Sequence, residues 1–261
     1  AAGVCYMTEP VLEVEYEPFE ATTTKIDFED GDVSMFAIYD TNRLGISAVD
    51  DADNGTKVAN FTCGNANAIA LGTYNHSELS LQAGMVSYSF DFNLGDVSGQ
   101  SAITIGDALI HTGDAGGFVG KNSWGYGSKG SIFYIGTNRG KLNGSNNENY
   151  VVINGVAVAG STLENKASDI FGKWFHAEVV VNVATKLVAY TITDKNDSVY
   201  WSDGGVAWLS SDAETATQID VYLGNKGTIL LDNLDITSYK SNAVFADYTI
   251  QYVDAEGNQL K

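Results

Sequence analysis

The stretch GMVSYSFDFNLGD, residues 84–96, decides the fold class of this chain. Apolar side chains stand at every second position and polar ones between them: Val86, Tyr88, Phe90, Phe92 and Leu94 against Ser87, Ser89, Asp91 and Asn93. Successive side chains of a β-strand point to opposite faces, so this alternation predicts a long strand with one buried and one solvent-facing side. Antiparallel sheets that meet water on one face have this pattern.

The stretch WFHAEVVVNVATKLVAYTITD, residues 174–194, predicts two further strands. Ala177, Val179 and Val181 share one face, ATK forms a turn, and a second strand runs through Tyr190 and Ile192. Turn signals separate the other strand-like runs, which are SMFAIYD (34–40), SAITIG (101–106), SIFYIGT (131–137), YVVINGVAVAG (150–160), QIDVYLGN (218–225) and TILLDNLDITSY (228–239). Helical periodicity is scarce. About eight to twelve short strands at this spacing predict an all-β protein, an antiparallel β-sandwich.

The charge of the chain limits its partners. Its 261 residues include 33 Asp and Glu against 14 Lys and Arg, a formal net charge of −19. This excess argues against nucleic acid and anionic membrane surfaces as partners, because binding to phosphates requires clustered Lys and Arg. No apolar run reaches the roughly 18 residues that a membrane-spanning helix requires. The two cysteines, Cys5 and Cys63, either form a disulfide bond or remain separate thiols, and the sequence leaves both possibilities open.

Three segments differ in pattern. Residues 1–22 are an N-terminal arm or linker, residues 23–241 form the β-sandwich domain, and residues 242–261 are a linker and the start of a following small β module. The last segment contains YTIQYVDAEGNQLK, which predicts a hairpin with its turn at AEGN. We therefore expect flanking modules in the same chain.

Two runs at the ends of the domain carry a resemblance to known modules. IDFEDGDVSMF (26–36) and ILLDNLDI (229–236) resemble the opening and closing strands of lectin-like jelly rolls. These are the carbohydrate-binding modules of families 4, 9 and 22 and the related laminin-G and concanavalin-like modules. YTIQYVDAEGNQLK resembles the start of a small repeat module in large secreted polysaccharide-degrading proteins of gut and rumen bacteria. The resemblance implies a jelly-roll β-sandwich of the concanavalin and laminin-G type in a secreted, extracellular bacterial protein.

The resemblance also implies a structural calcium ion. In the resembling modules calcium ties the first and last strands together, and the matching positions here are Glu29 and Asp232, with Asp30 as a weaker candidate. Two adjacent carboxylates repel each other unless a cation or a proton lies between them. Calcium takes six to eight oxygen ligands from carboxylates and carbonyls, which suits this setting. The alternative is that these acids face water on edge strands.

Several aromatic residues lie in runs that are typical of a sugar-binding surface. Sugars have flat apolar faces and hydroxyl rims, so their sites combine exposed aromatic rings with hydrogen-bonding side chains. A glycine-rich run (113–131) and the run DSVYWSDGGVAWLSSD (197–212) offer both. The predicted ligand-binding residues are Lys121, Asn122, Trp124, Tyr126, Arg139, Tyr150, Tyr200 and Trp201. Sheet packing is the alternative for each aromatic residue, and it is the expected role of Trp174 and Trp208.

The sequence gives little sign of catalysis. It lacks the Glu-X-Asp-X-X-Glu run of the laminarinase-like sandwich glycosidases and has no Gly-X-Ser-X-Gly motif. His76, His111 and His176 are far apart in sequence, and a structural role is expected for His176. We therefore expect no catalytic residues. The sequence predicts a non-catalytic carbohydrate-binding module of a larger secreted protein, which binds plant-cell-wall or related polysaccharide by aromatic stacking and hydrogen bonds. Two alternatives stay open: a structural or adhesive module of an extracellular surface protein or fibre, and a sandwich-fold polysaccharide lyase or glycosidase.

Overall fold

The structure of the chain is a computed structural model. The structure describes residues 20–38, 44–64, 70–95, 101–108, 130–142, 145–153, 156–157, 172–223 and 226–240. The predicted arm before residue 20, the predicted module at 242–261 and Cys5 lie outside these residues. Cys63 is buried, with 2% of its surface exposed.

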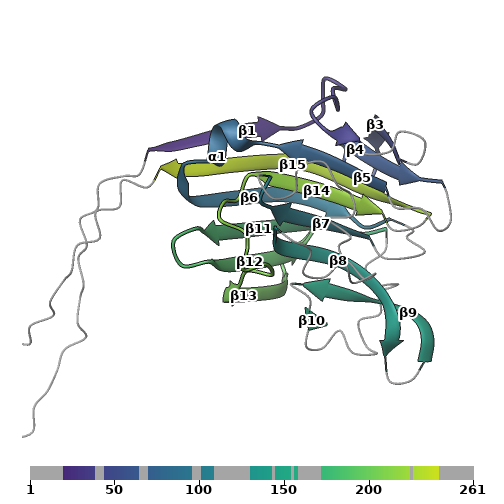
Figure 1. The fold of residues 1–261 in the computed structure, drawn as a ribbon. Coiled ribbons are helices and arrows are strands. Elements are labelled where there is room, and N and C mark those ends of the chain that lie inside the picture. Colours follow the sequence, from purple (N-terminus) through teal and green to yellow (C-terminus); the bar gives the residue numbers. More distant parts are fainter. Residues whose placement is uncertain are drawn as a thin grey trace, which may run out of the picture.

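Two antiparallel sheets make up the described part of the molecule (Figure 1). The eight-stranded sheet has the order β13 (Val199–Ala207), β12 (Leu187–Asp194), β11 (Trp174–Asn182), β6 (Ala83–Asn93), β15 (Gly227–Lys240), β4 (Thr56–Cys63) and β3 (Leu44–Asp51), with β1 (Ala21–Ile26) also paired to β15. The seven-stranded sheet has the order β10 (Val156–Ala157), β9 (Ser145–Ile153), β8 (Ser131–Leu142), β7 (Ser101–Gly106), β14 (Gln218–Leu223), β5 (Ala70–Asn75) and β2 (Ala37–Ile38). Only the four-residue helix α1 (Ser77–Ser80) interrupts the strands described, so the predicted all-β antiparallel sandwich is confirmed. The described helix is far too short to cross a membrane.

The core lies between the sheets and follows the alternation of the strands. In β6 the apolar set Val86, Tyr88, Phe90 and Phe92 is at most 1% exposed. The predicted hairpin is formed by β11 and β12, which pair from Phe175 with Asp194 to Asn182 with Leu187. Burial of these aromatic and branched side chains is the main source of stability, at about 1.5–3 kcal/mol for each large apolar side chain.

Strand β15 holds the eight-stranded sheet together. On one side it pairs with β6. On its other side it pairs first with β4, over Gly227–Leu231, and then with β1, over Leu234–Tyr239. The first and last described strands are therefore neighbours (Figure 1). Asp232 and Asn233 lie at the bulge where the partner changes, and Asn233 adopts a left-handed backbone conformation with φ of 48°.

The hairpin of β3 and β4 was not among the strands predicted from the sequence. Its turn, residues 52–55, ends in Asn54 and Gly55, a pair that favours tight hairpin turns. The Asp51 carboxylate accepts hydrogen bonds from the backbone N–H groups of Asp53 and Asn54 at 3.0 and 2.8 Å. Gly55 has a φ of 78°, which glycine adopts without strain. This turn shapes the candidate site described below.

His76 makes the stability of the fold depend on pH. Its ring is buried, with Nδ1 2.9 Å from Ser80 Oγ and Nε2 3.2 Å from the Tyr88 hydroxyl. Burial lowers the pKa of His76 to about 4, whereas an unfolded histidine has a pKa near 6.5. The stability that depends on the neutral ring is therefore complete above pH 6.5 and is lost as the pH falls toward 4. We expect this group to lower the free energy of unfolding by about 2–3 kcal/mol between pH 7 and pH 4.

Urea denaturation of the parent chain and of His76→Gln at pH 7, 5.5 and 4 measures this effect. Comparison of the two proteins is needed because Asp220 acts in the opposite direction: burial raises the pKa of its carboxyl to about 6, which favours the folded state as the pH falls. The variant keeps Asp220 and loses only the titration of His76. Equal decreases of the free energy of unfolding in both proteins would contradict the assignment.

Candidate functional site

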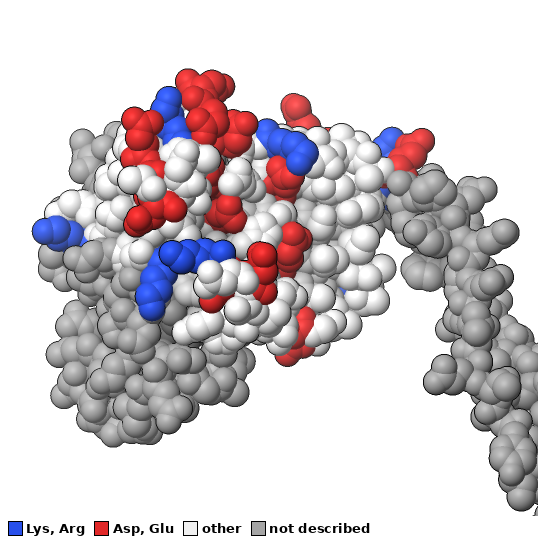
Figure 2. Space-filling view, turned by 180° about the vertical axis from the view of Figure 1, so that it is seen from behind, with Lys and Arg blue, Asp and Glu red and all other residues white. Residues whose placement is uncertain are grey.

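Polar side chains form a connected cluster on the outer face of the eight-stranded sheet. The turn between β3 and β4 folds over this face. Asn54 Nδ2 donates a hydrogen bond to Asp232 Oδ2 of β15 at 2.6 Å, and Trp174 Nε1 of β11 donates to Asp51 Oδ1 at 3.2 Å. Figure 2 shows Asp and Glu side chains gathered on the described surface, with separate Lys side chains beside them.

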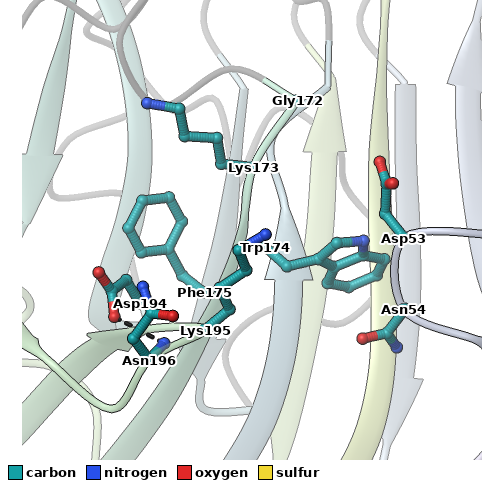
Figure 3. Close-up of a pocket in the computed structure, with 9 residues that line it drawn as sticks. All are labelled: Asp53, Asn54, Gly172, Lys173, Trp174, Phe175, Asp194, Lys195 and Asn196. Carbon is teal, nitrogen blue, oxygen red and sulfur yellow. Dashed lines mark hydrogen bonds between the residues drawn. The ribbon is translucent and has the colours of Figure 1, made fainter.

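A pocket of about 380 Å³ opens beside this turn. Its lining comes from three places: the β3–β4 turn, the beginning of β11 and the turn between β12 and β13 (Figure 3). The nine lining residues are Asp53, Asn54, Gly172, Lys173, Trp174, Phe175, Asp194, Lys195 and Asn196. Two turns and one strand end therefore enclose a space large enough for a small organic ligand.

Trp174 is the aromatic wall of the pocket. It is half-buried, and its indole extends toward Asp53 and Asn54, while the adjacent Phe175 points the other way (Figure 3). Phe175 is 5% exposed and belongs to the core, where it packs against Trp201. The alternation of β11 thus directs Phe175 into the core and Trp174 toward the β3–β4 turn.

Hydrogen bonds within the β12–β13 turn fix part of the polar rim of the pocket. The Asp194 carboxylate accepts hydrogen bonds from the backbone N–H groups of Asn196 and Ser198 at 2.8 and 3.1 Å, and these bonds lower the pKa of Asp194. The side chains of Lys173, Lys195 and Asn196 are exposed at the rim. They provide hydrogen-bond donors and acceptors beside the indole ring.

A chain of hydrogen bonds runs from the turn across the sheet. Asp232 Oδ2 accepts from Thr56 Oγ1 at 2.7 Å as well as from Asn54, and Asn233 Nδ2 donates to Asp91 Oδ2 at 2.7 Å. The same Asn233 amide lies 3.4 Å from Asp232 Oδ2, so it links the two carboxylates, which stand opposite each other on β6 and β15. Burial raises the pKa of the Asp232 carboxyl, and the negative charge of Asp91 adds to this effect.

The other end of this chain is a charged histidine. His176 Nδ1 lies 2.7 Å from Asp91 Oδ1, and Nε2 lies 3.0 Å from Glu178 Oε1. The hydrogen bond to Asp91 raises the pKa of His176 to about 9, so the ring is positively charged at neutral pH. Ser89 Oγ, 3.3 Å from Nε2, completes a Ser–His–Asp arrangement. Nε2 lies closer to Glu178 Oε1, at 3.0 Å, than to the Ser89 hydroxyl, so both ring nitrogens face carboxylates.

The residues predicted to bind calcium each have protein partners. Glu29 Oε1 accepts a hydrogen bond from the backbone N–H of Lys57 at 2.9 Å, and Asp30 Oδ1 accepts one from the Asp32 N–H within its own turn. Asp232 Oδ1 is buried without a hydrogen-bond partner. Within the described ranges, no group of three or more His, Cys, Asp or Glu side chains could hold a metal ion. The calcium site stays a prediction.

The predicted sugar-binding residues do not form one group in the described structure. Lys121, Asn122, Trp124 and Tyr126 lie outside the described residues, as do the side chains of Arg139 in β8 and Tyr150 in β9. Tyr200 is 37% exposed at the edge strand β13. Trp201 is a correction: it is 7% exposed and packs in the core beside Phe175, so its ring offers no surface platform.

Trp174 and Asn54 were not predicted as site residues, although the sequence holds a signal for each. In β11, Trp174 lies on the same side of the strand as the polar residues His176 and Glu178, because these positions are two residues apart. A tryptophan on the polar side of a strand points away from the core. Asn54 belongs to the Asn-Gly turn described above.

No family model matches the sequence, and no curated protein matches it. Solved structures show the fold. A sialidase is similar with a TM-score of 0.51 and 11% identity, over 89% of this chain and 22% of the sialidase. The lectin UEA-II, solved in complex with galactose, is similar with a TM-score of 0.50 and 13% identity, over 83% of this chain and 98% of the lectin. The described domain therefore has a lectin-like jelly-roll β-sandwich fold.

The hydrogen bond from Asn54 in the β3–β4 turn to Asp232 in β15 should contribute measurably to the free energy of unfolding. Asn54→Ala removes the donor closest to the buried Asp232 carboxylate, and we expect the free energy of unfolding to fall by about 1.5–3 kcal/mol, because hydrogen bonds to charged groups are worth that much. Asp53→Ala changes an exposed side chain of the same turn and should cost less than about 0.5 kcal/mol. Urea denaturation of both variants measures the difference, and equal losses would refute the role given to Asn54.

Proposed function

We propose that this chain is a carbohydrate-binding module and that it binds sugar in the pocket beside Trp174. The observation that carries the proposal is a half-buried indole that forms one wall of a space of about 380 Å³ with amide, carboxylate and ammonium groups around it. An aromatic ring stacks on the apolar face of a sugar, and the surrounding polar groups bond to its hydroxyls.

The pocket is suited to this task because its parts are fixed before a ligand arrives. The bond from Trp174 to Asp51 orients the indole, and the bonds within the β12–β13 turn orient Asn196. A preformed site loses less conformational entropy on binding than a flexible one. The lectin-like fold of the domain agrees with this role.

The wider setting of the chain is part of the same proposal. We infer a non-catalytic module of a larger secreted bacterial protein, which holds plant-cell-wall or related polysaccharide close to a partner module. A tethered module raises the effective concentration of substrate without new chemistry. The support is the resemblance of the terminal strands and of YTIQYVDAEGNQLK to such proteins.

Binding of the purified chain to a panel of soluble and insoluble polysaccharides, with calcium and with chelator, tests the proposal. We expect retention on at least one polymer and a loss of affinity of about tenfold or more in Trp174→Ala, because stacking and its buried area are removed. Trp174→Phe keeps a ring on that wall and should retain most of the affinity. Asn196→Ala should weaken binding through the lost hydrogen bond.

Two further variants separate this pocket from other aromatic surfaces. Tyr200→Ala changes an exposed ring on β13 that does not line the pocket and should leave the affinity unchanged. Trp124→Ala tests the glycine-rich run singled out from the sequence. Retention that survives Trp174→Ala and is lost in Trp124→Ala would move the site away from this pocket. Absence of retention on every polymer would overturn the carbohydrate-binding proposal.

A further inference from the structure

Two lysines at the rim of the pocket beside Trp174 keep their ammonium groups free. Lys173 and Lys195 both line the pocket and are exposed to solvent. Within the described ranges neither ammonium group forms an ion pair or a hydrogen bond. Other lysines of the described part each bond to a carboxylate or a backbone carbonyl: Lys25, Lys57, Lys186 and Lys240. In a chain with a large excess of acids, two free positive charges thus meet at one pocket.

The two lysines stand at the same end of one pair of strands. The antiparallel pairing of β11 and β12 reaches Phe175 and Asp194 at this end. Lys173 directly precedes the first residue of β11, and Lys195 directly follows the last residue of β12. The strand pairing therefore fixes the backbone positions from which both side chains reach the rim.

The acidic residues of the pocket leave both ammonium groups available. The Asp194 carboxylate already accepts two backbone N–H groups of its own turn. These bonds do most to lower the pKa of Asp194, and the charge of Lys195 adds to the effect without an ion pair. Asp53 belongs to the β3–β4 turn, and Figure 3 shows it beyond the indole of Trp174, whereas Lys173 extends the other way. The two lysines and Asp53 therefore face the pocket from different elements.

We infer that the pocket binds a sugar residue that carries a carboxylate, a uronic acid, with Lys173 and Lys195 on the carboxylate and Trp174 on the face of the ring. The inference rests on the carbohydrate-binding role proposed above and names the class of sugar. An ammonium group is a compact charge with three donors, and its bond to a carboxylate is stronger than a bond to a neutral hydroxyl. Asp53 is left to accept hydrogen bonds from sugar hydroxyls.

The net charge of the chain limits how many acidic sugars can bind together. The formal charge is −19, and Figure 2 shows Asp and Glu side chains gathered on the described surface. At physiological ionic strength, charges more than about 8 Å apart are largely screened, so a single carboxylate interacts mainly with the two lysines beside it. A run of adjacent acidic sugars would place further carboxylates along the acidic surface and would be repelled. The pocket therefore suits an isolated acidic branch on a neutral polysaccharide.

Isothermal titration calorimetry with matched oligosaccharides tests the inference. One ligand is a xylo-oligosaccharide with a single glucuronic acid branch, and the other is its methyl ester, which keeps the ring and loses only the charge. We expect the acid to bind about threefold or more tightly than the ester, because two exposed ion pairs contribute about 1.4- to fivefold each. A galacturonic acid disaccharide and its methyl ester form a second pair. A long polygalacturonate should bind more weakly, for each acidic residue, than the single branch.

Single lysine variants assign the preference to the pocket. Lys173→Met and Lys195→Met should each lower the affinity for the acid about two- to fivefold and leave the affinity for the ester unchanged. Lys240→Met makes the same change of charge at an exposed lysine that pairs with Glu20 and does not line the pocket, so it should bind both ligands as the parent chain does.

The outcomes separate this inference from the carbohydrate-binding proposal. Equal binding of acid and ester in both pairs, with both lost in Trp174→Ala, would overturn the acidic specificity and leave the carbohydrate-binding role standing. Affinity for the acid that survives unchanged in both Lys173→Met and Lys195→Met would also overturn it. Retention on neutral polymers without binding of either acid would do the same. Absence of binding to every oligosaccharide and every polymer would overturn both proposals.

Discussion

The pairing of β15 is the constraint on which the described structure depends. This one strand pairs with β6 on one side and with both β4 and β1 on the other. It therefore joins strands from the start and from the end of the domain in one sheet. A bulge in the ladder to β6 lies at the same place as the change of partner, and Asn233 adopts there the left-handed conformation that asparagine tolerates better than most residues. The bulge then determines where Asp232 and the Asn233 amide stand on the outer face.

This arrangement brings two like charges together, and the fold compensates for it with neutral donors. Asp232 and Asp91 are directly opposite across the ladder, a pairing that destabilises a sheet when nothing lies between the carboxylates. Asn233 donates to Asp91, while Asn54 and Thr56 donate to Asp232. The positive charge of His176 lies on the far side of Asp91. Hydrogen-bond donors therefore offset the repulsion between these two carboxylates.

The sequence predicts the fold better than the site, for a physical reason. Alternation in β6 and β11 is a local property of consecutive residues, so the strands and their buried faces can be read directly, and so can the pairing of the first and last strands from the resemblance. The pocket depends on two turns and a strand end that are distant in sequence. Asn54 and Asn196 line one pocket with Trp174 only because the folded chain brings the β3–β4 turn and the β12–β13 turn close to the start of β11. Trp201, by contrast, has an apolar environment that its neighbours in sequence do not reveal.

The polar face also explains why Trp174 can be both structural and accessible. An indole is large enough to cover apolar surface with one side while its other side stays available, and its N–H needs a partner when it is partly buried. Asp51 provides that partner from the same turn whose Asn54 holds Asp232. One turn thus fixes the aromatic wall of the pocket and anchors the strand that closes the sheet. A change in that turn acts on stability and on the geometry of the pocket together, because both depend on where residues 51–55 lie over the sheet.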